Sequence, residues 1–291
     1  MHILVTGAAG LIGSHSMRSL LEQGHTVTAT DIAPLPEALL DSLSHYPLEQ
    51  VTADLTSIPA VDAIFDSANP PFDAVVHVGG VRSPVGMDPR LVHNINVTAT
   101  YNVLYTAVSR GVRRLVQASS CNALGLSWTK PEHWHVDYVP VDEKHPKRPE
   151  DAYSLSKQVI EAQAESLCRL YPGTRIASLR MHYTRQSVTE TTSGVKHTGL
   201  WAWSSVKAVV DATVLALTSE GWEGAEVFHI ADDEIFYPAK GGEQSTSLEL
   251  LERHWSGRVT DVRKEWWEGS PRRSFFDTTK AKTLLGWTHT A

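Results

Sequence analysis

The sequence predicts an α/β protein in which a doubly wound parallel sheet carries helices on both faces. Short apolar segments alternate with helical ones through roughly the first 180 of the 291 residues. This alternation is typical of parallel strands joined by helical crossovers. The alternation of strands and helices is not found at residues 181–204 and 236–291, which contain most of the tryptophans. We therefore expect one sheet domain and a smaller, discontinuous C-terminal lobe.

Each expected strand is a short apolar run, and each expected helix has a longer amphipathic pattern. The strands are expected at Ile3–Thr6, Thr26–Thr30, Leu48–Ala53, Ala74–Val78, Arg114–Ala118 and Arg175–Arg180. Helices are expected at Leu11–Gln23, Ile58–Ala68, Val92–Arg110 and Ala152–Tyr171, and a further helix at Val206–Ser219 leads into a strand at Glu226–Ile230. Residues 1–180 and about 205–235 thus form the sheet domain, and residues 181–204 and 236–291 form the lobe, which we expect to bind substrate.

Composition favours a soluble enzyme over other classes of protein. The formal net charge of −7 argues against nucleic acid as a partner, because phosphate-binding surfaces need concentrated basic residues. We expect no membrane contact, since no apolar run is long enough to span a bilayer, and no signal peptide, since His2–Thr6 already reads as a strand. Cys121 and Cys168 are the two cysteines, so we expect a reducing, cytoplasmic location.

A glycine-rich turn joins the first strand to the first helix. It reads Thr6-Gly7-Ala8-Ala9-Gly10-Leu11-Ile12-Gly13. Glycine permits a tight turn and lets the backbone approach a diphosphate, to which the helix N-terminus presents amide donors. Because this turn stands between a strand and a helix, the context that the motif needs, it predicts a Rossmann-type dinucleotide-binding domain.

An aspartate follows the second strand, where it can select the dinucleotide. Asp31 lies 18 residues after Gly13, and an acid there accepts hydrogen bonds from the adenosine ribose hydroxyls and repels a 2′-phosphate. Since no arginine follows nearby, NAD is favoured over NADP. Asp54 and Leu55, after the third strand, could hold the adenine edge, although Asp54 could equally cap the next helix.

Three polar residues point to proton-transfer chemistry at the carboxyl edge of the sheet. Tyr153 and Lys157 are four residues apart, on one face of the expected helix. Ser120 ends the stretch Leu115-Val-Gln-Ala-Ser-Ser120, an apolar strand that finishes in hydroxyls at the edge where ligands bind in open α/β sheets. The joint occurrence of these residues in this order is far more specific than any one of them.

With these motifs, the chain resembles the extended short-chain dehydrogenase/reductase superfamily, specifically its NAD-dependent sugar epimerase/dehydratase group. Matching segments are His77-Val-Gly-Gly80, Asn96-Val-Thr-Ala-Thr100, Asp142-Glu143 with Pro146, Leu179-Arg180 and Ala281-Lys-Thr-Leu-Leu-Gly-Trp287. The resemblance implies that NAD contacts Gly7, Gly10, Leu11, Ile12, Gly13, Asp31, Asp54, Leu55, Val78, Gly79, Gly80, Asn96, Ala118, Tyr153, Lys157 and Met181. It also implies a homodimer that pairs helices Val92–Arg110 and Ala152–Tyr171.

The resemblance implies a catalytic role for each of the three polar residues. Tyr153 would be the acid/base for a substrate hydroxyl, and Ser120 would bind the same oxygen. Lys157 would hold the nicotinamide ribose and stabilise the tyrosinate, since a phenol with a pKa near 10 is otherwise a poor base.

The residues after Ser120 narrow the reaction. Dehydratases of the group carry an Asp-Glu pair there, whereas this chain has Cys121 and Asn122, so dehydration is not expected. The Ser119-Ser120-Cys121-Asn122 stretch is closer to the uronate dehydrogenase branch, and Tyr183 replaces an asparagine common in nucleotide-sugar enzymes. We therefore expect an NAD-dependent oxidoreductase acting on a sugar-like secondary alcohol. A nucleotide-sugar epimerase and a non-catalytic NAD sensor remain alternatives.

Substrate specificity is expected to lie in loops around the three catalytic candidates. The substrate candidates are Val81, Arg82, Ser120, Cys121, Asn122, His182 and Tyr183. Arg185 and Lys196 are candidates by position alone, and Trp201 and Trp203 could stack on a sugar or pack in the core. His133 and His135 have no third ligand at suitable spacing, so no metal site is expected.

Overall fold

A parallel sheet of seven strands forms the centre of the computed structural model, which describes residues 1–186, 197–237 and 245–290. In spatial order the strands are β10 (Gly224–Ile230), β7 (Arg175–Met181), β5 (Arg114–Ser120), β4 (Ala74–His77), β1 (His2–Thr6), β2 (Thr26–Asp31) and β3 (Leu48–Thr52). Chain order reverses between β1 and β4, which creates a crevice at the carboxyl edge where open α/β sheets bind ligands. The predicted doubly wound fold is therefore confirmed.

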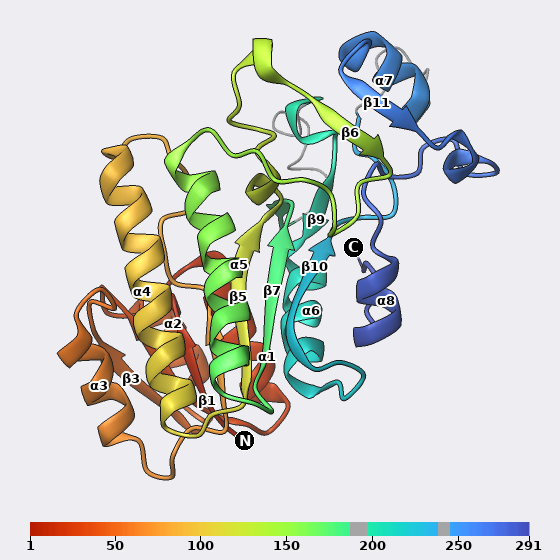
Figure 1. Cartoon of the computed structure of the whole chain (residues 1–291). Helices are drawn as coiled ribbons and strands as arrows, with labels where there is room; N and C mark the ends of the chain where they lie inside the picture. The colour runs from red at the N-terminus through yellow and green to blue at the C-terminus, as the bar shows by residue number, and fades with distance from the viewer. Residues whose placement is uncertain (187–196, 238–244, 291) are drawn as a thin grey trace.

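Helices cover both faces of the sheet (Figure 1). The front of the view shows α4 (Pro89–Ser109) and α5 (Ala152–Leu170), with α3 (Ile58–Ser67) beside them; α1 (Leu11–Glu22) and α6 (Val206–Thr218) lie behind. The short helix α2 (Glu37–Leu43), which follows β2, was not expected. In the described parts of the chain, no helix is both long and apolar enough to cross a membrane.

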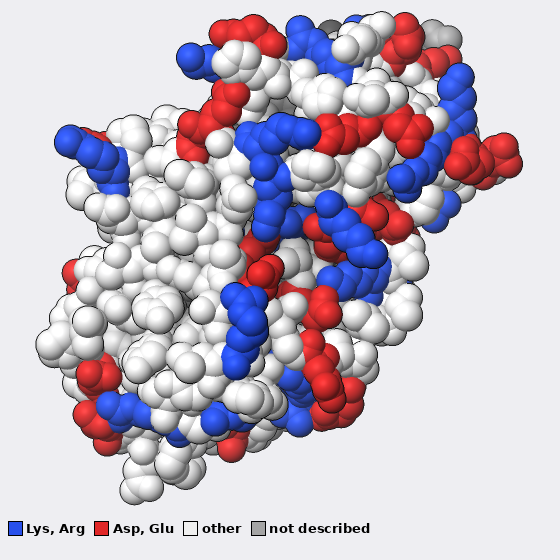
Figure 2. Space-filling view, viewed as in Figure 1, with Lys and Arg blue, Asp and Glu red and all other residues white. Residues whose placement is uncertain are grey.

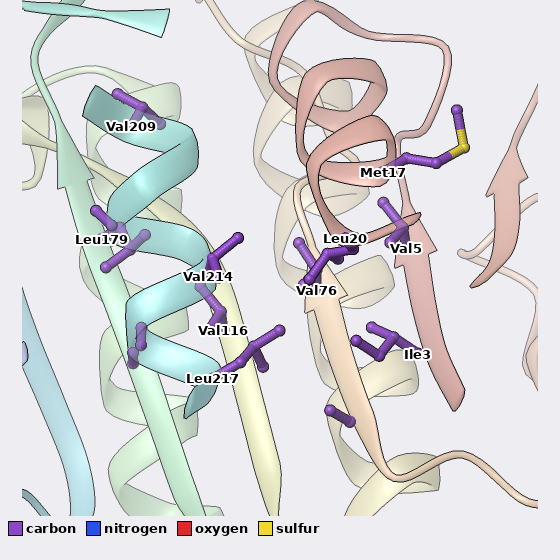
Figure 3. Close-up of a cluster of buried hydrophobic side chains, with 14 of the residues drawn as sticks. Ile3, Val5, Met17, Leu20, Val76, Val116, Leu179, Val209, Val214 and Leu217 are labelled. Carbon is purple, nitrogen blue, oxygen red and sulfur yellow. The ribbon is translucent and has the colours of Figure 1, made fainter. Parts of the chain in front are cut away.

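Two apolar clusters hold these layers together, one on each face. Ile3 and Val5 point into the cluster beneath α1 and α6, whereas Leu4 points into the cluster beneath α3, α4 and α5. Figure 3 shows the first cluster, in which Met17 and Leu20 of α1 pack over the sheet. Because side chains alternate between faces along a strand, burial on both faces requires the continuous apolar runs seen in the sequence.

Strand and helix positions agree with prediction to within about three residues at each end. One shift affects the site: β5 runs to Ser120 rather than ending at Ala118. The two serines thus belong to the strand itself, where Ser120 pairs in register with Met181 of β7.

A smaller lobe lies beyond the carboxyl edge of the sheet, at the top right of Figure 1. It contains β6 (Val136–Val139) paired with β11 (Val259–Val262), β8 (Tyr183–Arg185) paired with β9 (Trp203–Ser205), and α7 (Ser247–Trp255). Single-turn 3₁₀ helices occur at Cys121–Leu124, Pro131–His133, His197–Gly199 and Lys264–Trp267.

The apolar clusters divide the chain differently from the expected domain boundaries. The lobe cluster includes Leu124, Val136 and Val141, which precede residue 180. Conversely, α8 (Thr279–Leu285) and Trp287 pack into the sheet-domain cluster. We propose that the lobe begins near residue 124 and that the last helix belongs to the sheet domain.

Candidate active site

The glycine turn between β1 and α1 leaves no room for side chains. A Cβ atom on Gly13 would lie 2.1 Å from the carbonyl oxygen of Gly7, and one on Gly7 would lie 2.6 Å from the backbone of Gly79. Gly7 also has a φ of +67°, a conformation that favours glycine. Helix α1 begins after Gly10, with Leu11 and Ile12 in its first turn. No side chain caps this end of the helix, and its first turn contains no acidic residue. Its first amides are thus available to an anion.

Asp31 is fixed beside this turn. Its Oδ2 accepts a hydrogen bond from the Ala9 amide at 3.0 Å, and its Oδ1 accepts one from the Ile32 amide at 2.8 Å. Each carboxylate oxygen keeps a further lone pair, which suits a ribose diol. We call the glycine turn, residues 7–13, the cradle. The cradle and Asp31 together fit a dinucleotide without a 2′-phosphate.

Asp54 has a local structural partner. Its Oδ1 accepts bonds from the amide and hydroxyl of Thr56 at 2.9 and 2.8 Å, which lower the pKa of Asp54. Ser57, not Asp54, is the residue before the first turn of α3. Leu55 is buried in the cluster beneath α3, α4 and α5.

The loop after β4 is held by a buried asparagine. Asn96 Oδ1 accepts a bond from the Val81 amide at 2.7 Å, and Asn96 Nδ2 donates to the Val81 carbonyl at 3.0 Å. The same Nδ2 donates to Ser156 Oγ on α5 at 2.9 Å. This asparagine therefore ties the loop of Val78, Gly79 and Gly80 to two helices, and keeps it against the glycine turn.

His77 supports the same loop from below. Its Nδ1 lies 2.7 Å from Thr6 Oγ1, and its Nε2 lies 3.1 Å from Thr100 Oγ1. Burial, with a smaller effect from the Lys157 charge, lowers the pKa of His77 to about 3, so the ring is neutral. We did not single out this residue from the sequence.

The structure brings Ser120, Tyr153 and Lys157 together. Ser120 is the last residue of β5, and its Oγ accepts the Asn122 amide at 3.1 Å. Tyr153 lies in the first turn of α5, and Lys157 lies one turn later, with Nζ 5.6 Å from the centre of the Tyr153 ring. Lys157 Nζ also donates to the Ala118 carbonyl at 2.8 Å. All three side chains are buried.

Burial shifts the two titratable groups in opposite directions. It raises the pKa of Tyr153 to about 12, although a hydrogen bond with Ser120 acts in the lowering direction. It lowers the pKa of Lys157 to about 8, against the attraction of Glu161. We expect Lys157 and the positive nicotinamide ring to stabilise the tyrosinate together, whereas in the protein alone the phenol pKa is raised. At neutral pH the phenol is protonated and can donate.

A buried ion pair continues this face of α5. Glu161 follows Lys157 by one turn, and its two carboxylate oxygens each lie 2.9 Å from Arg180, at Nε and Nη2. Ser119 Oγ donates to the same carboxylate at 2.7 Å, and Lys147 Nζ lies 3.2 Å away. The i, i+4, i+8 spacing of residues 153, 157 and 161 was a signal for Glu161 that we did not use.

The substrate candidates have different environments. Cys121 is buried and its pKa is raised to about 11 by burial, which is unsuited to a nucleophile. Asn122 Oδ1 accepts the Ser127 amide at 3.2 Å. Val81 is held by Asn96, and Arg82 is exposed.

Beyond β7, His182 and Tyr183 also differ. His182 is buried, and its Nε2 lies 3.2 Å from His229 Nδ1. Burial lowers the pKa of His182 to about 3. The ring of Tyr183 is half-buried, and the guanidinium carbon of Arg185 lies 3.4 Å from the centre of this ring.

The two tryptophans pack inside the protein. Trp201 and Trp203 are 2% and 5% exposed, and Trp201 packs in the lobe cluster against Phe275. Lys196 lies outside the described residues. His133 and His135 pair with Glu150 and Asp137. Within the described ranges, no group of three or more His, Cys, Asp or Glu side chains could hold a metal ion.

Replacing Gly13 with alanine tests the cradle. The Gly13→Ala methyl group would overlap the Gly7 carbonyl oxygen, so the turn must shift at a cost typical of overpacking, roughly 1–3 kcal/mol. We expect a lower melting temperature and at least tenfold weaker NAD binding in calorimetry. Gly24→Ala, at a glycine with open space around it, is the control for NAD binding. Equal NAD affinity in Gly13→Ala and the unmodified protein would refute the cradle.

The fold and the site together define a Rossmann-type dinucleotide-binding protein. Residues 3–185 match the model of the "NAD dependent epimerase/dehydratase family". The chain belongs to this family, whose enzymes are of the extended short-chain dehydrogenase/reductase type and use NAD.

Individual relatives are similar over part or all of the chain. UDP-glucose 4-epimerase of Mus musculus is 31% identical over 181 residues, which are 57% of this chain and 49% of the relative. The chain thus spans about half the length of the curated relatives that it matches. Among solved structures, UDP-glucose 4-epimerase from Thermotoga maritima with UDP-glucose has a TM-score of 0.70 at 23% identity, covering 100% of this chain and 94% of that one. A mutated uronate dehydrogenase has a TM-score of 0.64 at 23% identity, with coverages of 100% and 82%.

Proposed function

We propose that this protein carries out NAD-linked oxidation and reduction at a secondary alcohol carbon of a sugar-like molecule. The observation that carries the proposal is the buried set of Ser120, Tyr153 and Lys157, which lies at the same carboxyl edge of the sheet as the glycine turn. A pair of hydroxyls next to a buried ammonium suits proton transfer at a substrate oxygen.

In this proposal the cofactor lies along the crevice between β1 and β4. Gly7, Gly10, Leu11, Ile12 and Gly13 would hold its diphosphate through backbone amides, and Asp31 would hold the adenosine ribose. Val78, Gly79, Gly80, Asn96, Ala118 and Met181 would line its path to the reacting end. When bound, NAD would supply the hydride acceptor and donor and, when oxidised, a positive charge.

The protein's own groups would manage the proton and the substrate oxygen. Tyr153 Oη would exchange a proton with the substrate oxygen, and Ser120 Oγ would hydrogen-bond to that same oxygen. Because burial keeps the Tyr153 phenol protonated, it is a donor in the protein alone. To act as a base, it needs positive charge nearby, and the Lys157 ammonium is the group best placed to help.

Net dehydrogenation and epimerisation differ in the fate of the reduced cofactor. We favour a dehydrogenase of free sugars or sugar acids, because Cys121 and Asn122 follow Ser120 and Tyr183 replaces the usual asparagine. The test follows NADH absorbance with a panel of aldoses and uronates, with added NAD. Stoichiometric NADH formation from a free sugar supports the dehydrogenase, and its absence across the panel counts against it.

A nucleotide-sugar 4-epimerase is the second candidate. It is supported by the 31% identity to UDP-glucose 4-epimerase of Mus musculus over 57% of this chain, and by the family match over residues 3–185. An epimerase returns the hydride, so UDP-glucose and UDP-galactose would interconvert without released NADH. Chromatography of the two sugar nucleotides after incubation distinguishes this candidate from the first.

Replacing Lys157 with methionine should stabilise the fold while it impairs catalysis. The fold lowers the pKa of Lys157 from 10.5 to about 8, so below pH 8 the folded state bears the full cost of a buried ammonium. That cost shrinks as the pH rises from 8 to 10.5. After the lost bond to Ala118 is subtracted, we expect Lys157→Met to raise the free energy of unfolding at pH 7 by on the order of 1–3 kcal/mol.

Urea unfolding at pH 7 and pH 10.5 measures this effect, and the gain should fade at the higher pH. Lys207→Met, at a surface lysine paired with Asp211, should change stability by no more than about 0.5 kcal/mol. If Lys157→Met were less stable than the unmodified protein at pH 7, the buried Lys157 charge would not be the source of a cost in folding free energy.

We also propose a homodimer and a cytoplasmic location. Leu91, Tyr101, Tyr105, Leu155 and Leu170 lie on α4 and α5 and are 41–61% exposed, and Figure 2 shows a face there that is largely white. A face with several exposed apolar or aromatic side chains and few charged ones is typical of an interface. Tyr105→Glu should give a monomer by light scattering, whereas Ile58→Glu, on α3, should not.

The proposed cytoplasmic location rests on the cysteines. Cys121 and Cys168 are both unpaired, which supports a reducing compartment.

A further inference from the structure

A cavity of about 590 Å³ opens at the edge of the sheet opposite to the catalytic candidates. Arg114, Arg175 and Gly224, the first residues of β5, β7 and β10, contribute to its lining. Because β5 is seven residues long, this edge lies roughly 20 Å from Ser120. The volume is in the range of small-molecule sites.

Three of the residues that line this cavity are arginines. Arg114 and Arg175 are register partners on adjacent parallel strands, so their side chains leave the same face of the sheet. Like charges in such a pair repel unless an anion lies between them. Arg113 adds a third guanidinium, which donates to the carbonyls of Val108 and Val112. Cys168 adds no negative charge, since burial raises the pKa of its thiol to about 11.

A surface glutamate occupies the position between the two strand arginines. Glu220 Oε1 lies 2.7 Å from Arg114 Nη2, and Glu220 Oε2 lies 3.2 Å from Arg175 Nη1. The hydrogen bond from Arg114 and the charge of Arg175 lower the pKa of Glu220, so it is a carboxylate at neutral pH. Its side chain is 71% exposed, and exposed ion pairs of this kind are weak. The carboxylate shows that an oxyanion fits between the arginines.

Two residues that line the cavity, Thr174 and Arg175, have buried polar atoms without hydrogen-bond partners among the described residues. Arg175 is nine-tenths buried, with its guanidinium carbon 5.4 Å from the centre of the Trp222 ring. Its Nη1 donates to the Ser219 carbonyl at 2.7 Å, but Nη2 has no hydrogen-bond partner among the described residues. The hydroxyl of the neighbouring Thr174 is buried and, within those same ranges, also without a partner. Unsatisfied buried polar atoms are costly, and both residues line the cavity.

We propose that this cavity binds a small organic oxyanion, a carboxylate or a phosphate ester, whose charged group replaces the Glu220 carboxylate between Arg114 and Arg175. Paired guanidinium groups bind such anions through charge-assisted hydrogen bonds. The site is separate from the cofactor crevice, so the oxyanion and NAD bind together.

Calorimetric titration tests the site independently of activity. Inorganic phosphate and malonate serve as probes, each at constant ionic strength. The unmodified protein should show saturable 1:1 binding of at least one probe, and their relative affinities tell a phosphate ester from a carboxylate. Glu220→Gln, which removes the competing carboxylate, should tighten binding about two- to fivefold. Arg114→Gln should weaken it at least tenfold.

Glu223→Gln is the matched control, because Glu223 lines the same cavity but is not one of the groups bridging the arginines. It should change affinity by less than twofold. The proposal is overturned if neither probe binds saturably to the unmodified protein or to Glu220→Gln, or if Glu223→Gln tightens binding as much as Glu220→Gln. Should Arg114→Gln unfold, the comparison of the two glutamate variants still decides.

Discussion

Tyr153→Phe should lower kcat/KM by about 10²–10⁴ on whichever substrate the protein turns over, while NAD binding and the melting temperature stay close to those of the unmodified protein. The change removes one oxygen atom and keeps the ring that packs at the start of α5. Burial raises the pKa of the Tyr153 phenol to about 12, so the phenol is protonated at neutral pH. The variant would therefore remove the proton donor of the substrate oxygen.

Steady-state kinetics on the variant and calorimetry with NAD measure the two parts of this expectation. Tyr101→Phe, on the exposed surface of α4, should leave both parts unchanged. Full turnover by Tyr153→Phe with NAD bound would remove Tyr153 from the mechanism.

Glu161→Gln should have the largest effect on stability, a loss of about 3–5 kcal/mol. The Arg180 guanidinium is 1% exposed and lies against both carboxylate oxygens of Glu161, which is fully buried. Removing the negative charge leaves Arg180 buried without its counter-ion. Burial alone would raise the pKa of Glu161, but the hydrogen bonds and charge of Arg180, together with Lys147 and Ser119, outweigh burial and lower that pKa.

Chemical unfolding at pH 7 measures the loss. The pair stabilises the fold above the pKa of an unfolded glutamate, near 4.5, and this stabilisation is lost as the pH falls through the lower pKa of the folded state. Glu165→Gln, one turn further along α5 and 54% exposed, should change stability by no more than about 0.5 kcal/mol. Equal losses in the two variants would show that the buried pair has no special role.

Local sequence signals predicted the sheet domain because most of its strands, β1 and β4 above all, are buried on both faces. Residues such as Ile3, Leu4 and Val5 are apolar in succession, and each following helix has its own apolar face. The glycine turn, Asp31 and the Tyr153–Lys157 spacing could be recognised for a different reason, because each lies within a single strand–helix unit.

Other parts of the structure depend on contacts between distant residues, which no local pattern contains. Strand β6 has four residues and pairs with β11, more than 100 residues later. Asn96 was expected to contact the cofactor, yet its hydrogen bonds to Val81 and Ser156 depend on the packing of α4 against α5. The pKa shifts of Tyr153 and Lys157 likewise follow from burial, which spacing along a helix does not reveal.

The packing of the last helix, α8, in the cluster beneath α1 and α6 limits how this protein can be re-engineered. The lobe cluster draws on several separated stretches, among them 124–141 and 248–276, while α8 and Trp287 pack beneath the sheet. No single cut in the chain therefore separates the lobe cluster from the cluster of the sheet domain. A new specificity would have to be built loop by loop upon an intact backbone, because a transplanted lobe would need several junctions at once.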